Sequence, residues 1–148
     1  MIIAVDFDGT IVEHRYPEIG NAKPLAFDVL KELQKQGHQL ILWTYRDGAE
    51  LDEAVEFCRK RGLEFYAINH SRPNEDFDQL VSRKIYADVY IDDRNIGGFI
   101  GWEKIRELLL DKSSIGYRAP RQEEKLKHSP KNKPGFNFKS FFNILLAW

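Results

Sequence analysis

Two carboxylates stand two residues apart near the start of the chain, in the run Asp6-Phe7-Asp8. In extended chain both carboxylates can face one ligand while Phe7 points to the other side. Gly9 and Thr10 follow directly: glycine allows a sharp turn and the close approach of a ligand, and a threonine hydroxyl can bond the loop's own backbone. An Asx turn that caps a strand would use the same residues, so the pair alone does not decide between chemistry and a turn.

A second acidic pair, Asp92-Asp93, follows the apolar residues 87–91. Like charges side by side are costly at a strand end unless a cation or a reaction needs them. The plainer interpretation is a turn or a helix cap before Asn95. Two acidic strand ends of one parallel sheet would meet at one edge, which favours a hard divalent cation such as Mg²⁺. Histidine and cysteine are absent from these strand ends, so zinc is not expected.

A hydroxyl and two cationic side chains fall near the same predicted edge. Thr44 ends a second apolar run, and Lys84 precedes Asp92 by eight residues. A hydroxyl and an ammonium beside carboxylates suit a phosphate group. Arg46 carries a planar fork of donors that could grip a second phosphate or a substrate carboxylate. Taken singly, these residues also fit a strand-end hydroxyl and solvated surface charges.

The elements that must position these groups alternate along the chain. Strands are predicted at residues 2–5, 39–44, 65–68 and 87–91, and helices at 24–36, 50–61 and 102–110. Such alternation implies parallel strands joined by right-handed crossovers, hence an open α/β sheet covered on both faces. Ligands bind beyond the carboxyl ends of such strands, which is where Asp6, Thr44 and Asp92 stand.

The last quarter of the chain has a different composition. We predict a catalytic domain at residues 1–112, a basic linker at 113–135 and an apolar, aromatic segment at 136–148. Residues 118–139 hold seven Lys or Arg and two Glu, although the whole chain has a net charge of −1. The last segment is expected to dock on the body or on a neighbouring subunit. Alternatively, the tail binds an anionic partner, either nucleic acid or a membrane surface.

Composition also bounds the cellular setting. A single cysteine, Cys58, excludes an intramolecular disulfide and a cysteine-rich metal site. The chain starts without a basic leader followed by an apolar run, and no stretch approaches the length of a membrane span. We therefore expect a cytoplasmic protein with no transmembrane segment.

Four motifs in order carry a resemblance to a known superfamily. The run DFDGT, the hydrophobic-Thr run ILWTYR, a Lys and the run YIDDR resemble the motifs of the haloacid dehalogenase superfamily of phosphotransferases, over residues 1 to about 110. The resemblance implies a doubly wound, Rossmann-like three-layer α/β/α sandwich with a mainly parallel sheet. Large cap domains enter such proteins after the first motif or between the second and third. Here only 13 residues separate Thr10 from Pro24, and a helix, a strand and a loop take up the interval from Thr44 to Lys84, so the chain is similar to the capless members.

The resemblance also implies a role for each motif residue. Asp6 would be the nucleophile that forms an aspartyl-phosphate, and Asp8 the general acid and then the base. Thr44 and Lys84 would hold the transferring phosphoryl oxygens. A Mg²⁺ ion would be held by Asp6, by Asp92 and by the backbone carbonyl of Asp8, with Asp93 acting through water or as a supporting partner.

The function that follows is a magnesium-dependent phosphomonoester hydrolase of unknown phosphorylated substrate. His14, Arg15 and Tyr16, in the loop after Thr10, are candidates for substrate specificity. Like Arg46, Arg94 could bind a substrate or be a surface charge, and for Arg94 we prefer an ion pair. An open site admits a bulky substrate or takes its lid from a partner subunit, so a homo-oligomer is one option. A phosphoryl-accepting signalling receiver is disfavoured, because it would carry its acidic pair at the first strand and its lysine last. A binding module that works through its basic tail is the other alternative.

Overall fold

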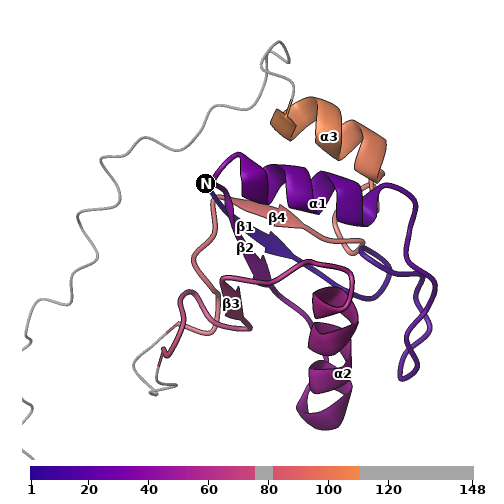
Figure 1. The fold of residues 1–148 in the computed structure, drawn as a ribbon, viewed down its shortest axis with the longest axis vertical. Coiled ribbons are helices and arrows are strands. Elements are labelled where there is room, and N and C mark those ends of the chain that lie inside the picture. The colour runs from indigo at the N-terminus through magenta and orange to yellow at the C-terminus, as the bar shows by residue number, and fades with distance from the viewer. Residues whose placement is uncertain (76–81, 111–148) are drawn as a thin grey trace, which may run out of the picture.

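The computed structural model describes residues 1–75 and 82–110 (Figure 1). The predicted linker at 113–135, the apolar segment at 136–148 and the predicted domain end at 112 lie outside these residues. So does the tail proposed to bind an anionic partner.

The described chain alternates strands and helices, as the sequence predicts. The elements are β1 (Ile2–Val5), α1 (Ala26–Lys35), β2 (Gln39–Leu42), α2 (Gly48–Arg59), β3 (Ala67–Ile68), β4 (Val89–Ile91) and α3 (Trp102–Leu110). The predicted bounds of the first strand and of the last helix are confirmed. The other three strands are shorter than predicted, because Trp43, Thr44, Phe65, Tyr66, Ala87 and Asp88 leave the ladder to form loops.

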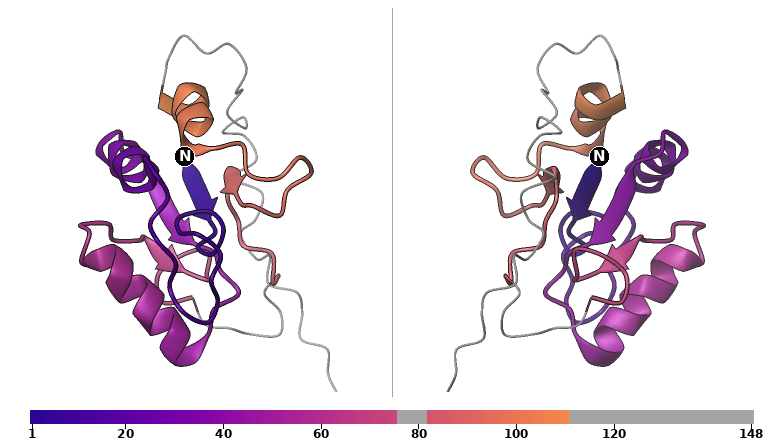
Figure 2. Two further views of the ribbon diagram at one scale, coloured as in Figure 1. Left: turned by 90° about the vertical axis from the view of Figure 1, so that its right-hand side faces the viewer. Right: turned by 90° about the vertical axis from the view of Figure 1, so that its left-hand side faces the viewer.

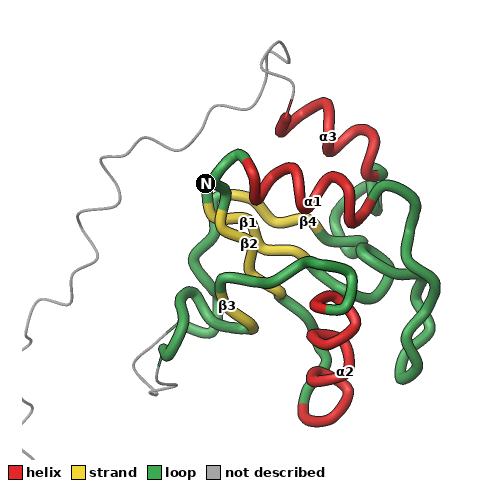
Figure 3. The backbone as a smooth tube through the Cα atoms, in the orientation of Figure 1, coloured by secondary structure: helices red, strands yellow, loops and turns green. Residues whose placement is uncertain are grey.

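All strand pairs in the sheet are parallel, and the strand order is β3-β2-β1-β4. Val5 at the end of β1 lies opposite both Leu42 of β2 and Ile91 of β4. The residues that follow these three strands therefore emerge at one level, and the loops that carry them gather at one end of the sheet (Figure 3). Asp6 continues the pairing, since its backbone N–H donates to the Ile91 carbonyl at 2.9 Å.

The larger apolar cluster lies on one face of the sheet. It joins the buried side chains at alternate strand positions, such as Ile3 and Val5, to buried residues of all three helices. Both views in Figure 2 show α1 and α2 on the same side of the strands. Regular 3.6-residue spacing on α1 supplies Val29, Leu30 and Leu33, each at most 1% exposed.

The opposite face carries a smaller cluster. It consists of Ala4, Ile41, Ala67 and Ile85, with partly buried neighbours that include Trp43 and Tyr90. Ile85 comes from the connection between β3 and β4, part of which is undescribed. No described helix contributes to this cluster, so the parallel α/β sheet is confirmed and the predicted three-layer sandwich is not.

No helix in the described part of the chain has the length and apolar character needed to cross a membrane. The cytoplasmic location stays a prediction from composition.

Candidate active site

Three carboxylates meet at the carboxyl ends of β1 and β4. Oxygen atoms of Asp6, Asp92 and Asp93 all lie within 4.8 Å of one another. The parallel register causes this convergence, because Asp6 follows Val5 and Asp92 follows Ile91, its partner in the ladder. Three hard oxygen donors at this spacing fit a divalent cation of the Mg²⁺ type. Asp8, the fourth predicted metal ligand, is not in this group of side chains.

Asp6 is a partly buried member of the acidic cluster and is bound by the loop that follows it. Its Oδ2 accepts a hydrogen bond of 2.9 Å from the Thr10 hydroxyl. Burial raises the pKa of Asp6 to about 7, and the charges of Asp92 and Asp93 add to the increase, while hydrogen bonds from Thr10 and the Phe7 backbone oppose it. A cation at this position would replace the repulsion among the three carboxylates by attraction.

Asp92 also closes a turn, so the plainer interpretation of this pair holds alongside the cluster. Its Oδ1 accepts from the Arg94 backbone N–H at 2.7 Å, and its carbonyl accepts from the Asn95 side chain at 3.0 Å. The turn fixes the carboxylate at the strand end with one oxygen engaged. The other oxygen is left for a ligand, since a carboxylate offers about four lone-pair sites.

Gly9 makes room for Asp93. Its φ is +91°, a conformation that favours glycine, and a Cβ built on it would stand 2.2 Å from Asp93 Oδ2. The Asp93 side chain is therefore packed directly against the backbone of Gly9. Only glycine satisfies both the conformation and the contact.

Asp8 is bound by a buried arginine. Arg46 Nε donates to Asp8 Oδ2 at 2.7 Å, and Nη2 donates to Oδ1 at 2.8 Å. The same guanidinium donates to the carbonyls of Pro17 and Glu18 at 2.8 and 2.9 Å. Arg46 is 1% exposed, and its pKa is raised chiefly by the hydrogen bond to Asp8.

The expected role of Arg46 at the open edge is therefore wrong. The guanidinium lies beneath the cavity between the Phe7 and Tyr16 rings, 5.1 and 5.3 Å from their centres. Its donors are engaged by one carboxylate and two carbonyls. Arg46 positions Asp8 and the loop after Thr10 instead of contacting a substrate.

Thr44 lies at the cavity wall, as predicted. Its backbone N–H donates to the Asn69 side-chain oxygen at 2.9 Å, and its hydroxyl oxygen accepts from the backbone N–H of Arg46 at 3.3 Å. The hydroxyl hydrogen is left to donate to a ligand. Asn69, with φ +52°, follows β3 and so ties the third strand to the Thr44 loop.

Lys84 does not lie with these groups. It is exposed, its ammonium lies 5.6 Å from the centre of the Tyr90 ring, and it is absent from the described residues that line the cavity. The reason is the course of the chain, because Tyr90 points to the face of the sheet opposite α1. A role for Lys84 in phosphate binding stays a prediction.

A cavity of about 590 Å³ opens over this cluster. Its lining combines carboxylates, a hydroxyl, ring-bearing side chains and one arginine, namely Asp6, Asp8, His14, Tyr16, Trp43, Thr44, Tyr45, Asp92 and Arg94. His14 and Tyr16, two of the predicted specificity residues, belong to it, and Arg15 does not. Arg94 borders the cavity through an exposed position.

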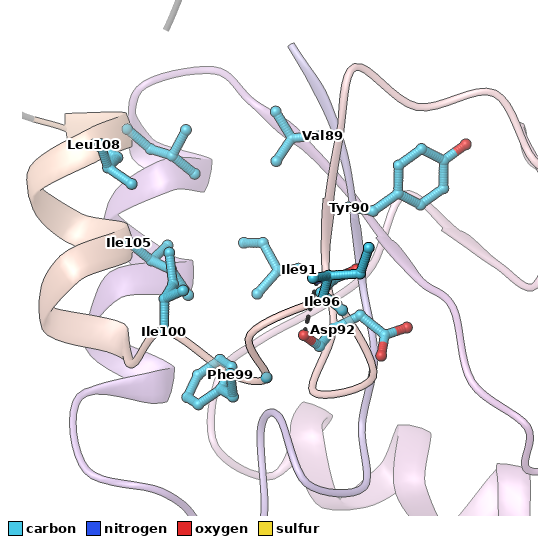
Figure 4. A pocket seen from close by; sticks show the side chains of 12 residues that line it. Val89, Tyr90, Ile91, Asp92, Ile96, Phe99, Ile100, Ile105 and Leu108 are labelled. Atoms are coloured by element: carbon cyan, nitrogen blue, oxygen red, sulfur yellow. Dashed lines mark hydrogen bonds between the residues drawn. The ribbon is translucent and has the colours of Figure 1, made fainter. Parts of the chain in front are cut away.

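A second pocket of about 370 Å³ lies between β4 and α3. Figure 4 shows Ile105 and Leu108 of α3 across it from Val89 and Ile91 of β4. Asp92 is its one charged lining residue among those described. The pocket lacks the groups for phosphate chemistry, which the first cavity contains.

Sequence reasoning missed several groups that shape the site. The Trp102 indole N–H donates at 2.9 Å to the carbonyl of Thr10, whose hydroxyl binds Asp6. A tryptophan at the start of an apolar helix is a weak signal, although a buried indole N–H usually finds an acceptor. Trp43 and Tyr45, which flank Thr44, were assigned no role. The signal that could have found them is an aromatic residue on each side of Thr44, the hydroxyl at the predicted strand end.

Comparisons with known proteins show a relative of this chain but no activity. A solved structure, that of the conserved protein coded by locus from Bacteroides thetaiotaomicron, is 56% identical in sequence and has a TM-score of 0.71. The match covers 77% of this chain and 93% of that chain. No family model and no curated protein matches the chain.

Proposed function

We propose that this chain, which belongs to the family of the conserved Bacteroides thetaiotaomicron protein, is a magnesium-dependent phosphomonoester hydrolase of the haloacid dehalogenase type. The observation that carries the proposal is the cavity that joins Asp6, Asp8, Thr44 and Asp92 at the carboxyl ends of parallel strands. A nucleophilic carboxylate, a second carboxylate for proton transfer, a hydroxyl donor and a cation site are the groups that phosphoryl transfer through an aspartyl-phosphate needs.

The finer fold belongs to the same proposal. A doubly wound three-layer sandwich requires the connection between β3 and β4 to cover the second face of the sheet. Ile85 supports this by packing on that face with Ala4 and Ile41. Among the described residues, the two intervals where large caps enter hold no more than a loop, one helix and one short strand, which supports the capless type.

The cation site consists of Asp6 and Asp92, with Asp93 beside them. When bound there, Mg²⁺ would offset the negative charge of both the nucleophile and the phosphoryl group. The side chains of this site offer only oxygen donors, which Mg²⁺ prefers. Burial and the charges of Asp92 and Asp93 raise the pKa of Asp6, and a bound cation would offset those charges.

The protein groups then divide the reaction. Asp6 attacks phosphorus, the bond from phosphorus to the ester oxygen breaks, and that oxygen takes a proton from Asp8. In the second step a water gives its proton to Asp8 and attacks the phosphorus of the aspartyl-phosphate, releasing inorganic phosphate and Asp6. Thr44 donates to a phosphoryl oxygen, and Arg46 fixes the Asp8 carboxylate at the cavity lining by binding both of its oxygens.

The test is hydrolysis of p-nitrophenyl phosphate by the full chain with Mg²⁺ and with EDTA. We expect turnover that requires the metal, is lost by more than a thousandfold in Asp6→Asn, and is unchanged in Asp52→Asn, an exposed aspartate of α2. Calorimetric titration with Mg²⁺ and circular dichroism establish that each variant binds metal and folds. A folded, magnesium-binding wild type without turnover on this ester or on a panel of natural phosphomonoesters contradicts the proposal.

A further inference from the structure

The walls of the cavity are made largely of rings. Four of the nine lining residues, His14, Tyr16, Trp43 and Tyr45, carry an aromatic or imidazole ring. They come from two separate segments: the loop after Thr10 supplies one pair, and the residues on either side of Thr44 supply the other. The rings therefore approach the cavity from two directions.

Two of these rings, those of Tyr16 and Tyr45, lie nearer to solvent than the reacting groups do. Tyr45 is 94% exposed and Tyr16 is 48% exposed, whereas the Asp8 side chain is 11% exposed. The phosphoryl group must reach Asp6 at the inner end, so the organic part of the ester extends outward between the rings. A fully exposed tyrosine at the mouth of a cavity leaves a large apolar surface in water, which a flat partner would cover.

The wall formed by the loop is held in place. Arg46 binds the carbonyls of Pro17 and Glu18, and its guanidinium lies 5.3 Å from the centre of the Tyr16 ring. Trp43 is fixed as well, because its backbone N–H donates to the Val5 carbonyl at 2.9 Å and its side chain packs against the smaller apolar cluster. Preformed rings cost little ordering on binding, which favours stacking.

The remaining lining residues favour a flat group next to the phosphate. The three carboxylates and Thr44 are committed to the phosphoryl group and the cation in the proposed reaction. Beyond them the cavity offers the four rings and the Arg94 side chain, whose flat faces suit stacking on a planar base. At about 590 Å³ the cavity falls within the usual range for a small-molecule site.

Resting on the proposed function, we infer that the substrate is a nucleoside monophosphate, whose base stacks between the Tyr16 and Trp43 sides of the cavity. Stacking of a base on an aromatic side chain is sequence-tolerant, so the rings select a base as a class and not one particular base. The phosphate lies at Asp6, and the base lies toward Tyr45.

The test compares adenosine 5′-monophosphate with ribose 5-phosphate, which share the leaving oxygen and differ by the base. We expect the full chain with Mg²⁺ to show a KM roughly tenfold or more lower for the nucleotide. Trp43→Leu and Tyr45→Leu should each remove most of that difference, measured as the ratio of the two KM values. Tyr86→Leu is the matched control, because Tyr86 is 50% exposed and lies outside the cavity lining.

Binding to Asp6→Asn separates this inference from the proposed function. Calorimetry with Mg²⁺ present measures both ligands without turnover. A tenfold preference for the nucleotide upholds recognition of the base by the rings even if the wild type hydrolyses neither ester, an outcome that would count against the hydrolase proposal and not against base recognition. Equal KM values for the two esters, or no saturable binding of either by folded Asp6→Asn, overturn the inference.

Discussion

Arg46 binds Asp8 through two parallel hydrogen bonds, from Nε to Oδ2 at 2.7 Å and from Nη2 to Oδ1 at 2.8 Å, in a position withdrawn from solvent. The pair fixes both torsions of the Asp8 side chain and links it to the loop after Thr10. A lysine cannot reproduce this fork, because its ammonium is a point charge on a flexible stem.

We expect Arg46→Met to lower the free energy of unfolding by about 3–5 kcal/mol, because it leaves a carboxylate without its buried partner. Arg46→Lys should fold better and still lose roughly tenfold or more in kcat, with KM for a small ester little changed. Urea unfolding and steady-state kinetics measure the two effects. Arg59→Met provides the control, because Arg59 makes the same fork with Glu56 on an exposed surface. If Arg46→Lys turns over at the wild-type rate, positioning by the fork is excluded.

The raised pKa of Asp6 predicts an unusual pH dependence of stability in EDTA. Between about 4 and 7 the folded state holds a proton on Asp6 that the unfolded state has lost, so stability falls as pH rises across this window. The cost is absent below the unfolded pKa and fully present above about 7. Each pKa unit corresponds to about 1.4 kcal/mol, so the whole effect is at most on the order of 4 kcal/mol.

Thermal unfolding of wild type and Asp6→Asn in EDTA measures this effect. The Asn variant should be more stable at pH 8, and the difference should shrink toward pH 4.5. Mg²⁺ should raise the wild-type midpoint more at pH 8 than at pH 5, because the proton competes with the metal. A difference between the two proteins that stays constant with pH would contradict the assignment.

Gly9 offers a test of the acidic cluster that leaves every carboxylate in place. An added methyl at Gly9 would displace Asp93, whereas Gly37, at φ +83°, has no atom within 4 Å of such a methyl. Both Ala variants carry the strain of positive φ, about 1–3 kcal/mol. Only Gly9→Ala should weaken Mg²⁺ binding and turnover, by roughly tenfold or more, as measured by calorimetry and by ester hydrolysis. Equal losses in the two variants would mean that contact with Asp93 does not matter.

Truncation after Gly116 tests whether the site needs the basic tail. The described residues that line the cavity all lie between Asp6 and Arg94, so turnover of p-nitrophenyl phosphate should stay within about twofold of the full chain. Circular dichroism establishes that the truncated protein folds. Loss of turnover in a folded truncate would assign residues 117–148 to the site.

The sequence predicted the strand-end positions well, because they depend on local rules. Apolar runs mark the strands, alternation with helices implies parallel pairing, and parallel pairing brings Asp6 and Asp92 together. Once the strands are identified, the residues at their carboxyl ends follow directly.

Contacts between loops were beyond such reasoning. The pairing of Asp8 with Arg46 depends on where loop 13–20 closes, and nothing in the spacing of 38 residues between them indicates it. The same holds for Lys84, whose distance along the sequence suggested the site while the chain carries it to the other face. In both cases a cation near a strand end does not face outward from that end.

The hydrogen bond from Trp102 to Thr10 spans 92 residues and joins the last described helix to the loop whose Thr10 hydroxyl binds Asp6. A growing polypeptide therefore makes the whole DFDGT run long before the helix that supports it leaves the ribosome. Such distant contacts are late events in folding, since a large loop must close first. The nascent chain therefore carries Asp6 and Asp8 early, and the loop that binds Asp6 gains its indole hydrogen bond only when the helix arrives.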